Sequence, residues 1–543
     1  MKSYLSKLIN NALESFDGID TIPDYQIEVP KEKSHGDLAV NVAMMLPKIL
    51  KKPPRAIAEE LIEKLEIDSS VIDAIEIAGP GFINVRFTHS CWIQQLEEVF
   101  KDGPGFGRSK QFYGNSVLIE FVSANPTGPL TVGHGRNAVL GDTVARLYEW
   151  NGAKVDREYY FNNAGRQMRV LGQSVQARYQ QILGDDAKLP EGGYEGEYIA
   201  DIAQSIYDQH GESWKEESHE PFKSFAEKEI FKLIEQTLQR MNINMDSFFN
   251  EHDLYEKGAI ESTLNELRDK NLVYDEDGAV WFKTTEFGKD KDTVLVKSSG
   301  EPTYRLPDIA YHADKINRGY DICIDVFGAD HIDTYPDVVN GVKSLGLDSD
   351  KIDVLVYQFV TLVKDGKPFK MSTRKANFVT LDELMDEVGE DVTRFFFLMR
   401  SPGTHLEFDI AQAKEASDKN PVFYFKYAHA RIRSIIRKAE EQLDITQPAD
   451  LSLLKEEQEL SLIKTLMQFP DYVELACRTK EPHRLHTYLD LLGTEFTQFY
   501  HHCRVLGIEE KELSLSRVRL LEATAQVIKN ALSILGIEAP ERM

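Results

Sequence analysis

Residues 123–142, SANPTGPLTVGHGRNAVLGD, combine residue types that can bind a phosphate group. They follow a β-rich run, VLIEFV at 117–122, and lead through a Pro/Gly loop into a helical pattern that begins beside Gly133 and His134. A strand–loop–helix junction of this kind presents free backbone N–H groups and the positive end of a helix dipole. A histidine at that point can donate a further hydrogen bond to a phosphoryl group during its transfer. The alternative is a histidine that only caps the helix.

A second candidate motif lies much later in the chain. Residues 366–374, GKPFKMSTR, follow a strand predicted at 352–363 and a tight turn at 364–366. A lone lysine such as Lys370 in a surface loop is usually only solvated. The surrounding string, read together with His134, favours a functional lysine instead.

Together these two stretches resemble the signature motifs of class I aminoacyl-tRNA synthetases, usually written HIGH and KMSKS. The residues around both are similar to those of arginyl-tRNA synthetases. The resemblance spans the whole chain, through residues 34–39, 79–84 and 162–168 to 541–543. It implies an α/β fold: a Rossmann-like parallel-sheet catalytic domain with a helical insertion, an α+β N-terminal domain and an all-α C-terminal bundle.

The resemblance assigns roles at the phosphates of ATP. His134 is expected to bind them while the amino acid carboxylate attacks the α-phosphorus, and Lys370 is expected to close over the β- and γ-phosphates as a movable point charge. The chain departs from the family pattern twice, with Thr131 for the first histidine and Thr373 for the second lysine, and threonine carries no charge. Arg374 is expected to supply the missing charge. The predicted ATP-binding set also contains Gly133, Met371 and Ser372.

A further part of the nucleotide site is predicted after the hydrophobic run at 322–327. The string Gly328-Ala329-Asp330-His331 stands at the expected end of a strand and matches the nucleotide-binding segment of the family. Asp330 or His331 is expected to hold the ribose hydroxyls. The alternative for Asp330 is a helix N-cap.

Two carboxylates and a tyrosine indicate a cationic substrate. Glu120 ends the first strand, and Tyr304 and Asp308 lie in the string PTYRLPDIA at 302–310. Carboxylates can bind the rigid fork of a guanidinium bidentately, whereas the alternative is that they stay unpaired in solvent. By resemblance, Glu120 and Asp308 pair with the guanidinium or the α-amino group of arginine. Tyr304 packs against its side chain, and Asn125 holds its backbone end.

Composition is ordinary for a soluble enzyme and disfavours several other classes. Hydrophobic residues make up 42% and charged residues 28% of the 543, and no apolar run is long enough to cross a membrane. The net charge of −26 argues against a general nucleic-acid binder, so RNA contacts are expected to be local basic patches. No metal site, zinc included, is predicted because no C-x-x-C pair occurs, and a reducing cytoplasm fits the scattered Cys91, Cys323, Cys477 and Cys503.

Periodicity and turn signals divide the chain into three expected regions. Residues 1–110 alternate helix-like and strand-like segments before a Gly/Pro-rich linker. Residues 111–416 alternate strands and helices, with a largely helical insertion at about 168–300, which predicts a parallel sheet with a site at the carboxyl ends of its strands. Residues 417–543 are nearly all helical. The last helix shows apolar residues at bundle spacing and is closed by Gly536: Val518, Leu521, Ala525, Ile528, Leu532 and Leu535.

RNA contacts are expected in the C-terminal region. Tyr427, Arg431 and Lys438 share one helical face by their spacing. Aromatic and cationic groups side by side can stack unpaired bases and neutralise phosphates, although an ordinary amphipathic helix is the alternative. The segment around Tyr427 resembles the start of the family's anticodon-binding domain, and the N-terminal region resembles the domain that the family associates with the tRNA elbow.

The sequence therefore predicts an enzyme that joins L-arginine to tRNA(Arg) through an arginyl-adenylate. The resemblance implies ATP accompanied by Mg²⁺ and a requirement for bound tRNA in the first step. We expect a cytoplasmic monomer without membrane contact. Two alternatives stay open: a class I ligase for another amino acid, and a non-catalytic tRNA-binding paralogue, for which Thr131 and Thr373 are the only support.

Overall fold

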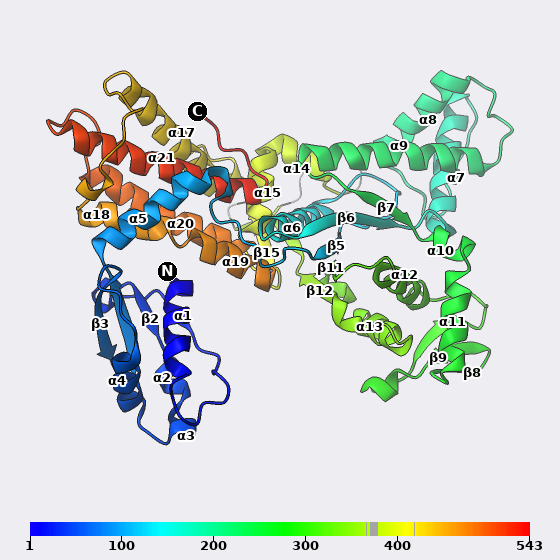
Figure 1. Cartoon of the computed structure of the whole chain (residues 1–543). Coiled ribbons are helices and arrows are strands. Elements are labelled where there is room, and N and C mark those ends of the chain that lie inside the picture. Colours follow the sequence, from blue (N-terminus) through cyan, green and yellow to red (C-terminus); the bar gives the residue numbers. More distant parts are fainter. Residues whose placement is uncertain (365, 370–377, 418) are drawn as a thin grey trace.

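The computed structural model describes residues 1–364, 366–369, 378–417 and 419–543. The predicted residues Lys370, Met371, Ser372 and Arg374 lie outside the described part of the chain. In Figure 1 the molecule is elongated, and a central sheet lies between a helical bundle on the left and projecting helices on the right. The N-terminal domain lies below the bundle in this view.

A five-stranded parallel sheet forms the centre of the molecule. Its strand order is β12-β11-β5-β6-β7, and every neighbouring pair is parallel. The chain thus adds strands outward from β5 on both sides, as doubly wound α/β folds do, and the expected Rossmann-like sheet is confirmed. The strands are β5 (Ser116–Glu120), β6 (Lys154–Phe161), β7 (Ser247–Asn250), β11 (Ile322–Gly328) and β12 (Ile352–Tyr357).

Helices cover both faces of this sheet. On one face lies α6 (Val132–Trp150), where Gly141 has no side chain and the ring of Phe121 fills the place of a Cβ. Because neighbouring residues of an extended chain point to opposite faces, Glu120 points to the other face. There it meets α12 (Arg305–Asn317), which lies beside α13 (Tyr335–Ser344) (Figure 1).

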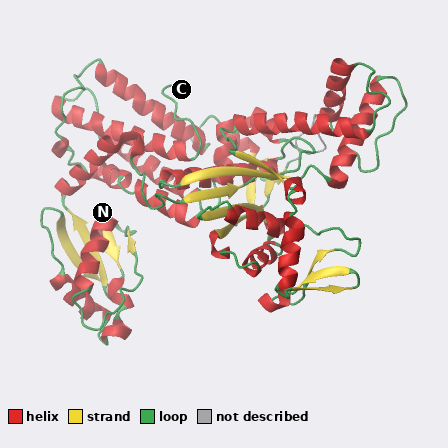
Figure 2. Ribbon diagram, turned by 45° about the vertical axis from the view of Figure 1, so that its right-hand side comes forward, coloured by secondary structure: helices red, strands yellow, loops and turns green. Residues whose placement is uncertain are grey.

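The largely helical insertion predicted at about 168–300 consists of helices followed by a smaller unit that also contains strands. Three helices project from the sheet, namely α7 (Gly165–Ile182), α8 (Glu197–His210) and α9 (His219–Arg240) (Figure 2). The chain then returns as β7, a strand of four residues that depends on its pairing with β6 and so carries little local signal. A second unit follows: α10 (His252–Glu256), α11 (Ala259–Asp269) and the antiparallel strands β8 (Val273–Glu276), β9 (Ala279–Phe282) and β10 (Thr293–Val296).

One predicted strand is two strands in the structure. The apolar run at 352–363 is divided at Gln358, whose carbonyl oxygen accepts a hydrogen bond from the guanidinium of Arg136. The chain leaves the central sheet there and forms a small second sheet. Its strands are β13 (Val360–Lys364), β14 (Lys367–Pro368) and β15 (Leu406–Asp409), and α14 (Leu381–Val388), α15 (Glu390–Leu398) and α16 (Ile410–Ala413) complete this region.

The N-terminal domain is α+β, as expected. A four-stranded antiparallel sheet has the order β1-β2-β4-β3 and is covered by helices. Its elements are α1 (Lys2–Leu13), β1 (Ile27–Glu28), β2 (Leu38–Val40), α2 (Val42–Met45), α3 (Pro47–Leu50), α4 (Pro54–Lys64), β3 (Ile72–Ala78) and β4 (Phe82–Phe87). The next helix, α5 (His89–Asp102), lies against the C-terminal helical bundle (Figure 1). The ammonium of Lys464 in the bundle lies 2.6 Å from the carboxylate of Asp37, which ties this domain to the bundle.

The C-terminal region is the expected helical bundle. Its helices are α17 (Pro421–Glu440), α18 (Glu457–Leu466), α19 (Phe469–Thr479), α20 (His483–His502) and α21 (Lys511–Ile534). The apolar residues predicted at bundle spacing are all buried, and Gly536 follows the helix with φ +73°. No helix among the described residues is both long and apolar enough to cross a membrane.

Candidate active site

The carboxyl ends of the parallel strands bring the candidate residues to one edge of the sheet. β5 ends at Glu120, β7 ends just before Glu251, and β11 ends at Gly328. Helix α6 begins at the same edge, two residues before His134. This is the edge at which ligands bind in open α/β sheets.

The loop after β5 is strained. Val122 and Ser123 have φ values of +66° and +46°, which residues other than glycine rarely adopt, and a β-branched residue such as Val122 least of all. The side chain of Asn137 holds this conformation, because its Oδ1 accepts the Val122 N–H at 2.6 Å and its Nδ2 donates to the Val326 carbonyl at 2.8 Å. Strain held in this way is typical of sites whose geometry matters.

Thr131 and His134 form a capping box at the start of α6. The backbone N–H of His134 donates to the Thr131 hydroxyl at 3.4 Å, and the backbone N–H of Thr131 donates to Nδ1 of His134 at 3.2 Å. An atom that accepts a backbone N–H carries no proton, so we assign the proton of the neutral ring to Nε2. Burial lowers the pKa of His134, which favours this neutral form. The histidine is thus both a cap and a donor through Nε2.

The described residues that follow the lysine motif lie against this helix start. Thr380 pairs with Thr131 in an antiparallel bridge, and the N–H of Leu381 donates to the Leu130 carbonyl at 2.8 Å. Gly135 permits the contact, because a Cβ there would lie 2.6 Å from Leu381 Cδ1. The chain that follows the lysine motif is therefore held beside Thr131 at Thr380 and Leu381.

Arg136 links the helix start to the second sheet. Its side chain is fully buried, and its guanidinium donates to the carbonyl oxygens of Gln358, Thr404 at 3.0 Å and Ser401 at 3.2 Å. Burial lowers the pKa of Arg136 to about 10, so the group is still charged at neutral pH. The two segments that lead into β13 and β15 are therefore held to the turn that follows His134.

The predicted ribose segment forms a 3₁₀ turn at Ala329–His331. A Cβ on Gly328 would lie 2.5 Å from Asp330 Oδ1, which accounts for the glycine. The N-cap of the next helix is Thr334, so Asp330 is not the helix cap that the sequence offered as an alternative. The Asp330 side chain is exposed, and the His331 ring stacks on Phe327 with centroids 5.4 Å apart.

Glu120 belongs to a row of acids across the sheet, here called the acid row, that comprises Asp325, Glu120 and Glu158. The three occupy the same register on the adjacent strands β11, β5 and β6. Cations from α12 and its C-cap neutralise them: the Lys315 ammonium donates to Glu120 and Asp325, and the guanidinium of the C-cap Arg318 donates twice to Glu158 at 2.7 Å. Glu120 is therefore buried and paired, which differs from the free carboxylate in solvent of the alternative interpretation.

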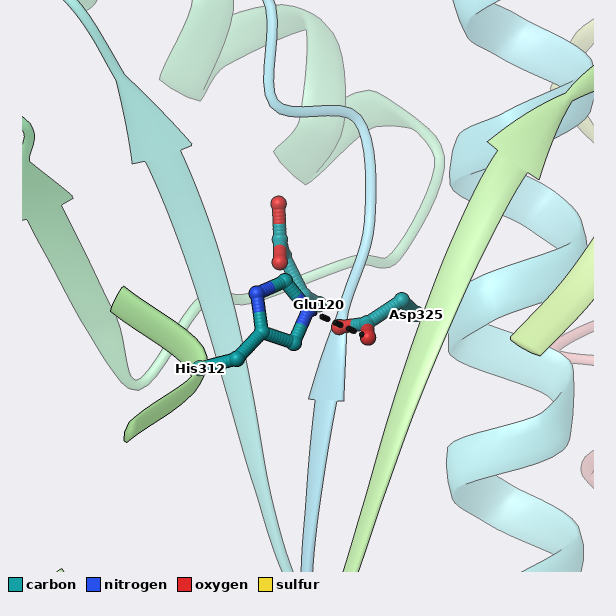
Figure 3. Close-up of side chains that lie close together, drawn as sticks. All are labelled: Glu120, His312 and Asp325. Carbon is teal, nitrogen blue, oxygen red and sulfur yellow. Dashed lines mark hydrogen bonds and ion pairs between the residues drawn. The ribbon is translucent and has the colours of Figure 1, made fainter. Parts of the chain in front are cut away.

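Three of these side chains approach closely enough to suggest a metal site. Potential ligand atoms of Glu120, His312 and Asp325 lie within 4.8 Å of one another (Figure 3). The Lys315 ammonium bonds both carboxylates, however, so the protein's own cation already compensates their charge. The dashed contact in Figure 3 joins His312 Nε2 to Asp325 at 2.8 Å. We interpret the group as an internal ion cluster.

Asp308 lies on α12 close to the acid row, and its backbone carbonyl faces His312 Nδ1 at 2.7 Å. Burial, together with the charges of Glu120 and Glu251, raises the pKa of the Asp308 carboxyl to about 7. Glu251 is also buried and accepts hydrogen bonds at 2.7 Å from Tyr160 and from Asn162. Among the described residues no cation bonds to the Asp308 carboxyl, although the charges of His312 and Lys315 partly offset this rise in its pKa.

The other two predicted arginine contacts lie nearer the surface. The Asn125 amide donates to Gln167 and accepts the N–H of Asn162, each at 3.0 Å, which links it to the segment 162–168. Tyr304 is the N-cap of α12, and 86% of its surface is exposed. The structure therefore brings Glu120 and Asp308 together but leaves Tyr304 open to solvent.

Comparison with known proteins agrees with this arrangement. Three family models match the chain: arginyl tRNA synthetase N terminal domain at residues 3–87, tRNA synthetases class I (R), catalytic domain at 106–397, and DALR anticodon binding domain at 425–543. The chain is 50% identical to the arginine–tRNA ligase of Salinibacter ruber and 49% identical to that of Desulfotalea psychrophila, with 100% of both chains covered in each case. The chain belongs to the arginyl-tRNA synthetases.

The fold agrees with this membership. The Thermus thermophilus arginyl-tRNA synthetase structure matches with a TM-score of 0.79 at 23% identity, over 100% of both chains. The family consists of class I enzymes that ligate arginine to tRNA, and the chain is such a ligase by membership. A class I ligase for another amino acid and a non-catalytic paralogue are not favoured.

The predicted tRNA contacts lie on α17 and face α20. Tyr427 is 41% exposed, and Arg431 donates to its hydroxyl at 3.1 Å. The Arg431 guanidinium also lies 4.4 Å from the ring centroid of Tyr500 and donates to its hydroxyl at 2.7 Å. The exposed side chain of Lys438 lies further along α17, and Phe423 stacks on Tyr427. The structure thus adds Tyr500 and Phe423 to the predicted group.

Several site residues escape a reading of the sequence. Lys315 looks like a solvated lysine, yet Asp308, His312 and Lys315 follow i, i+4, i+7 spacing and share one face of α12. Polar residues along one face of a helix that is expected to pack on a sheet indicate a buried polar site, and this pattern could have identified His312 and Lys315. Glu251 carries no such signal, because it enters the site only through the short strand β7.

Proposed function

We propose that the chain activates L-arginine with ATP at the carboxyl edge of its parallel sheet and then transfers the arginyl group to tRNA(Arg). The proposal rests mainly on one observation: the buried Glu120 and the partly buried Asp308 lie at the same edge of the sheet as the helix start of His134. A cation site beside a phosphate site is what joining arginine to ATP requires.

In the first step an oxygen of the arginine carboxylate attacks the α-phosphorus of ATP, and pyrophosphate leaves. His134 donates from Nε2 to the phosphoryl oxygens as negative charge builds on them. Thr131 keeps the ring and the helix start in place through the capping box. In the second step a hydroxyl of the terminal ribose of tRNA attacks the arginyl carbonyl carbon, and AMP leaves.

The nucleotide site combines the helix start with the lysine motif. Gly133 leaves room for the phosphates. Lys370 and Arg374 close over the terminal phosphates as charge-assisted donors, and Met371 and Ser372 belong to the same ATP-binding segment. Mg²⁺ enters with ATP as the counter-ion of its phosphates and is thus part of the substrate. The turn at Gly328, Asp330 and His331 receives the ribose. Support for this assignment comes from the anchoring of Thr380 and Leu381 beside Thr131 and Leu130.

The arginine site lies on the α12 side of the sheet edge. Asp308 binds the guanidinium or the α-ammonium group, and Glu120 borders the same space. Asn125 holds the backbone end of arginine from the loop after β5. Tyr304 stands exposed at the start of α12 and packs over the side chain of arginine when it binds.

The remaining regions are assigned to tRNA. We propose boundaries at 1–110, 111–416 and 417–543, with the first region on the tRNA elbow and the last on the anticodon. Tyr427, Arg431 and Lys438 are the proposed tRNA contacts of the bundle, where stacking and charge can act together. The chain acts as a monomer in the cytoplasm and uses no zinc.

An exchange assay tests the proposal. ATP–pyrophosphate exchange is measured with each amino acid in turn, with and without tRNA(Arg). Exchange that depends on arginine and on tRNA(Arg) is expected. Exchange with a different amino acid supports another class I ligase, and no exchange under any condition supports a non-catalytic tRNA-binding protein.

A further inference from the structure

Lys315 is a fully buried cation beside the proposed arginine site. Its side chain comes from α12 and donates to Oε2 of Glu120 on β5 and to Oδ1 of Asp325 on β11. The ring of Tyr311 lies 4.2 Å from its Nζ. Because the two acids occupy the same register on neighbouring strands, they would repel each other in the interior without this ammonium.

His312 adds a second positive charge to the same group. Its Nδ1 faces the Asp308 carbonyl at 2.7 Å and its Nε2 faces the Asp325 carboxylate at 2.8 Å. A carbonyl and an ionised carboxylate can only accept, so both ring nitrogens carry protons. Burial opposes this charge, but Asp325 raises the pKa of His312 above its ordinary value. Glu120, Asp325, Lys315 and His312 together therefore form a neutral cluster.

The other charged groups around Lys315 are accounted for separately. Glu158, the third member of the acid row, is bonded by Arg318 and by the Tyr311 hydroxyl at 2.6 Å. Burial raises the pKa of the nearby Cys323 thiol to about 11, so this group is neutral. Within the described part of the chain, the Asp308 carboxyl forms no ion pair and accepts no hydrogen bond from a cation; His312 and Lys315 act on it only through their charges.

Glu120 is thus held rather than free. Lys315 occupies Oε2, and the Ser123 hydroxyl donates to Oε1 at 2.9 Å. Both oxygens are fixed before any substrate arrives, and Ser123 itself belongs to the strained loop that leads to His134. A carboxylate neutralised in this way offers direction and hydrogen bonding, but little net charge, to a second cation.

We propose that Lys315 is a positioning and specificity-determining residue for the amino acid: it fixes the Glu120 carboxylate and cancels its charge, so that a cationic substrate is balanced by Asp308. The inference rests on the arginine site proposed above. Removal of Lys315 has two separate effects. Glu120 loses its tether, and the close pair Glu120–Asp325 takes up a proton near neutral pH because two buried carboxylates cannot both stay ionised.

The test uses full-length enzyme with tRNA(Arg) in the exchange assay between about pH 6 and pH 9. For Lys315→Met, KM for arginine is expected to rise about tenfold or more while KM for ATP stays within about twofold. The rise is expected to be larger at low pH, because Glu120 must first lose a proton. In the variant that combines Lys315→Met with Asp325→Asn, the extra pH dependence is expected to disappear while KM for arginine stays raised.

A matched control combines Arg318→Met with Glu158→Gln, which removes the ion pair at Glu158 and leaves no buried acid without its cation. It is expected to leave KM for arginine and its pH profile unchanged. The inference is overturned if Lys315→Met changes KM for ATP and arginine equally, or shows the wild-type KM for arginine and pH profile. If Lys315→Met alone does not fold, the charge-balanced double variant decides: an unchanged KM for arginine overturns the inference. Wild-type enzyme that activates no arginine contradicts the proposed function instead.

Discussion

The backbone N–H of Thr131 donates to Nδ1 of His134 at 3.2 Å, and this contact determines what the histidine can do. It makes Nδ1 an acceptor and leaves the proton on Nε2. Burial lowers the pKa of His134, so the ring stays neutral near pH 7. The helix cap and the phosphate donor, which the sequence presents as alternatives, are two functions of the same ring.

Removal of the donor is expected to slow activation. His134→Ala should lower adenylate formation about a hundredfold or more, because a donor fixed at the developing charge contributes about 3–4 kcal/mol. His134→Gln is the matched control, since its amide can replace Nε2 and it should retain more activity. Single-turnover formation of arginyl-adenylate with tRNA present measures the effect. Near-normal rates for His134→Ala would contradict the role.

The binding of arginine is expected to depend on pH through Asp308. Burial and neighbouring acids raise the pKa of its carboxyl to about 7, so below that pH the substrate must displace a proton. As the pH rises toward about 7, KM for arginine should therefore fall about tenfold per pH unit. Above about pH 7 it should become constant. Asp308→Asn should raise KM and remove this dependence. A flat KM for arginine in wild-type enzyme across this range argues against Asp308 as the ligand.

The site should reject neutral relatives of arginine. Citrulline has nearly the same shape but no charge and fewer donors, so it leaves buried acceptors without partners. Discrimination by roughly 10⁴ or more in kcat/KM is expected. Competition of citrulline against arginine in aminoacylation measures it, and efficient transfer of citrulline to tRNA would refute the pocket of Glu120 and Asp308.

Loss of Arg136 is expected to affect both stability and catalysis. Arg136→Met leaves the carbonyls of Gln358, Ser401 and Thr404 without their donor, at about 1–3 kcal/mol for each unsatisfied group. Thermal unfolding should shift downward, and kcat should fall more than KM for arginine changes, because the second sheet is no longer held to the helix of His134. Arg136→Lys should have a stability and a kcat between those of the wild type and those of Arg136→Met. A wild-type melting temperature for Arg136→Met would contradict the role of Arg136 in holding the second sheet to α6.

Parts of this fold follow from local sequence, and others do not. The helix after His134 and the last helix were predictable because cap, apolar spacing and closing glycine agree over many residues. β7 was not, because four residues gain their structure from pairing with β6. The break at Gln358 was not either, because it depends on a guanidinium 222 positions away.

The same division holds for the site. Glu120, Asp308 and His134 lie at expected strand or helix ends, so topology alone brings them to one edge. The neutralisation of Glu120 by Lys315 was not predictable, since both are ordinary charged residues until α12 packs on the sheet. A sequence motif therefore indicates where a site lies. Tertiary packing determines which of its charged groups are already paired within the protein and which can bind the substrate.

The end of the last helix is expected to tolerate no side chain. Gly536 has φ +73°, and a Cβ there would lie 2.3 Å from the guanidinium of Arg394. Arg394 is itself buried, where it donates to Asp142 at 2.6 Å and to the Leu535 carbonyl at 2.9 Å. Gly536→Ala should therefore destabilise the protein well beyond the about 1–3 kcal/mol of backbone strain alone.

Gly319→Ala is the matched control for this prediction. Gly319 has φ +89° but open space around the place of its Cβ, so only backbone strain is expected. Denaturant unfolding of both variants measures the difference. If both variants lose the same free energy of unfolding, the buried Arg394 does not constrain the end of the bundle.

The most direct test is a crystal structure of the enzyme with tRNA(Arg), L-arginine and an ATP analogue that cannot release pyrophosphate. The account predicts His134 Nε2 within about 3.2 Å of a phosphate oxygen, Lys370 on the same side of the nucleotide, and Asp308 against a positively charged group of arginine. An ATP analogue bound with His134 and Lys370 both remote from its phosphates, and an arginine with both cationic groups away from Glu120 and Asp308, would contradict the account.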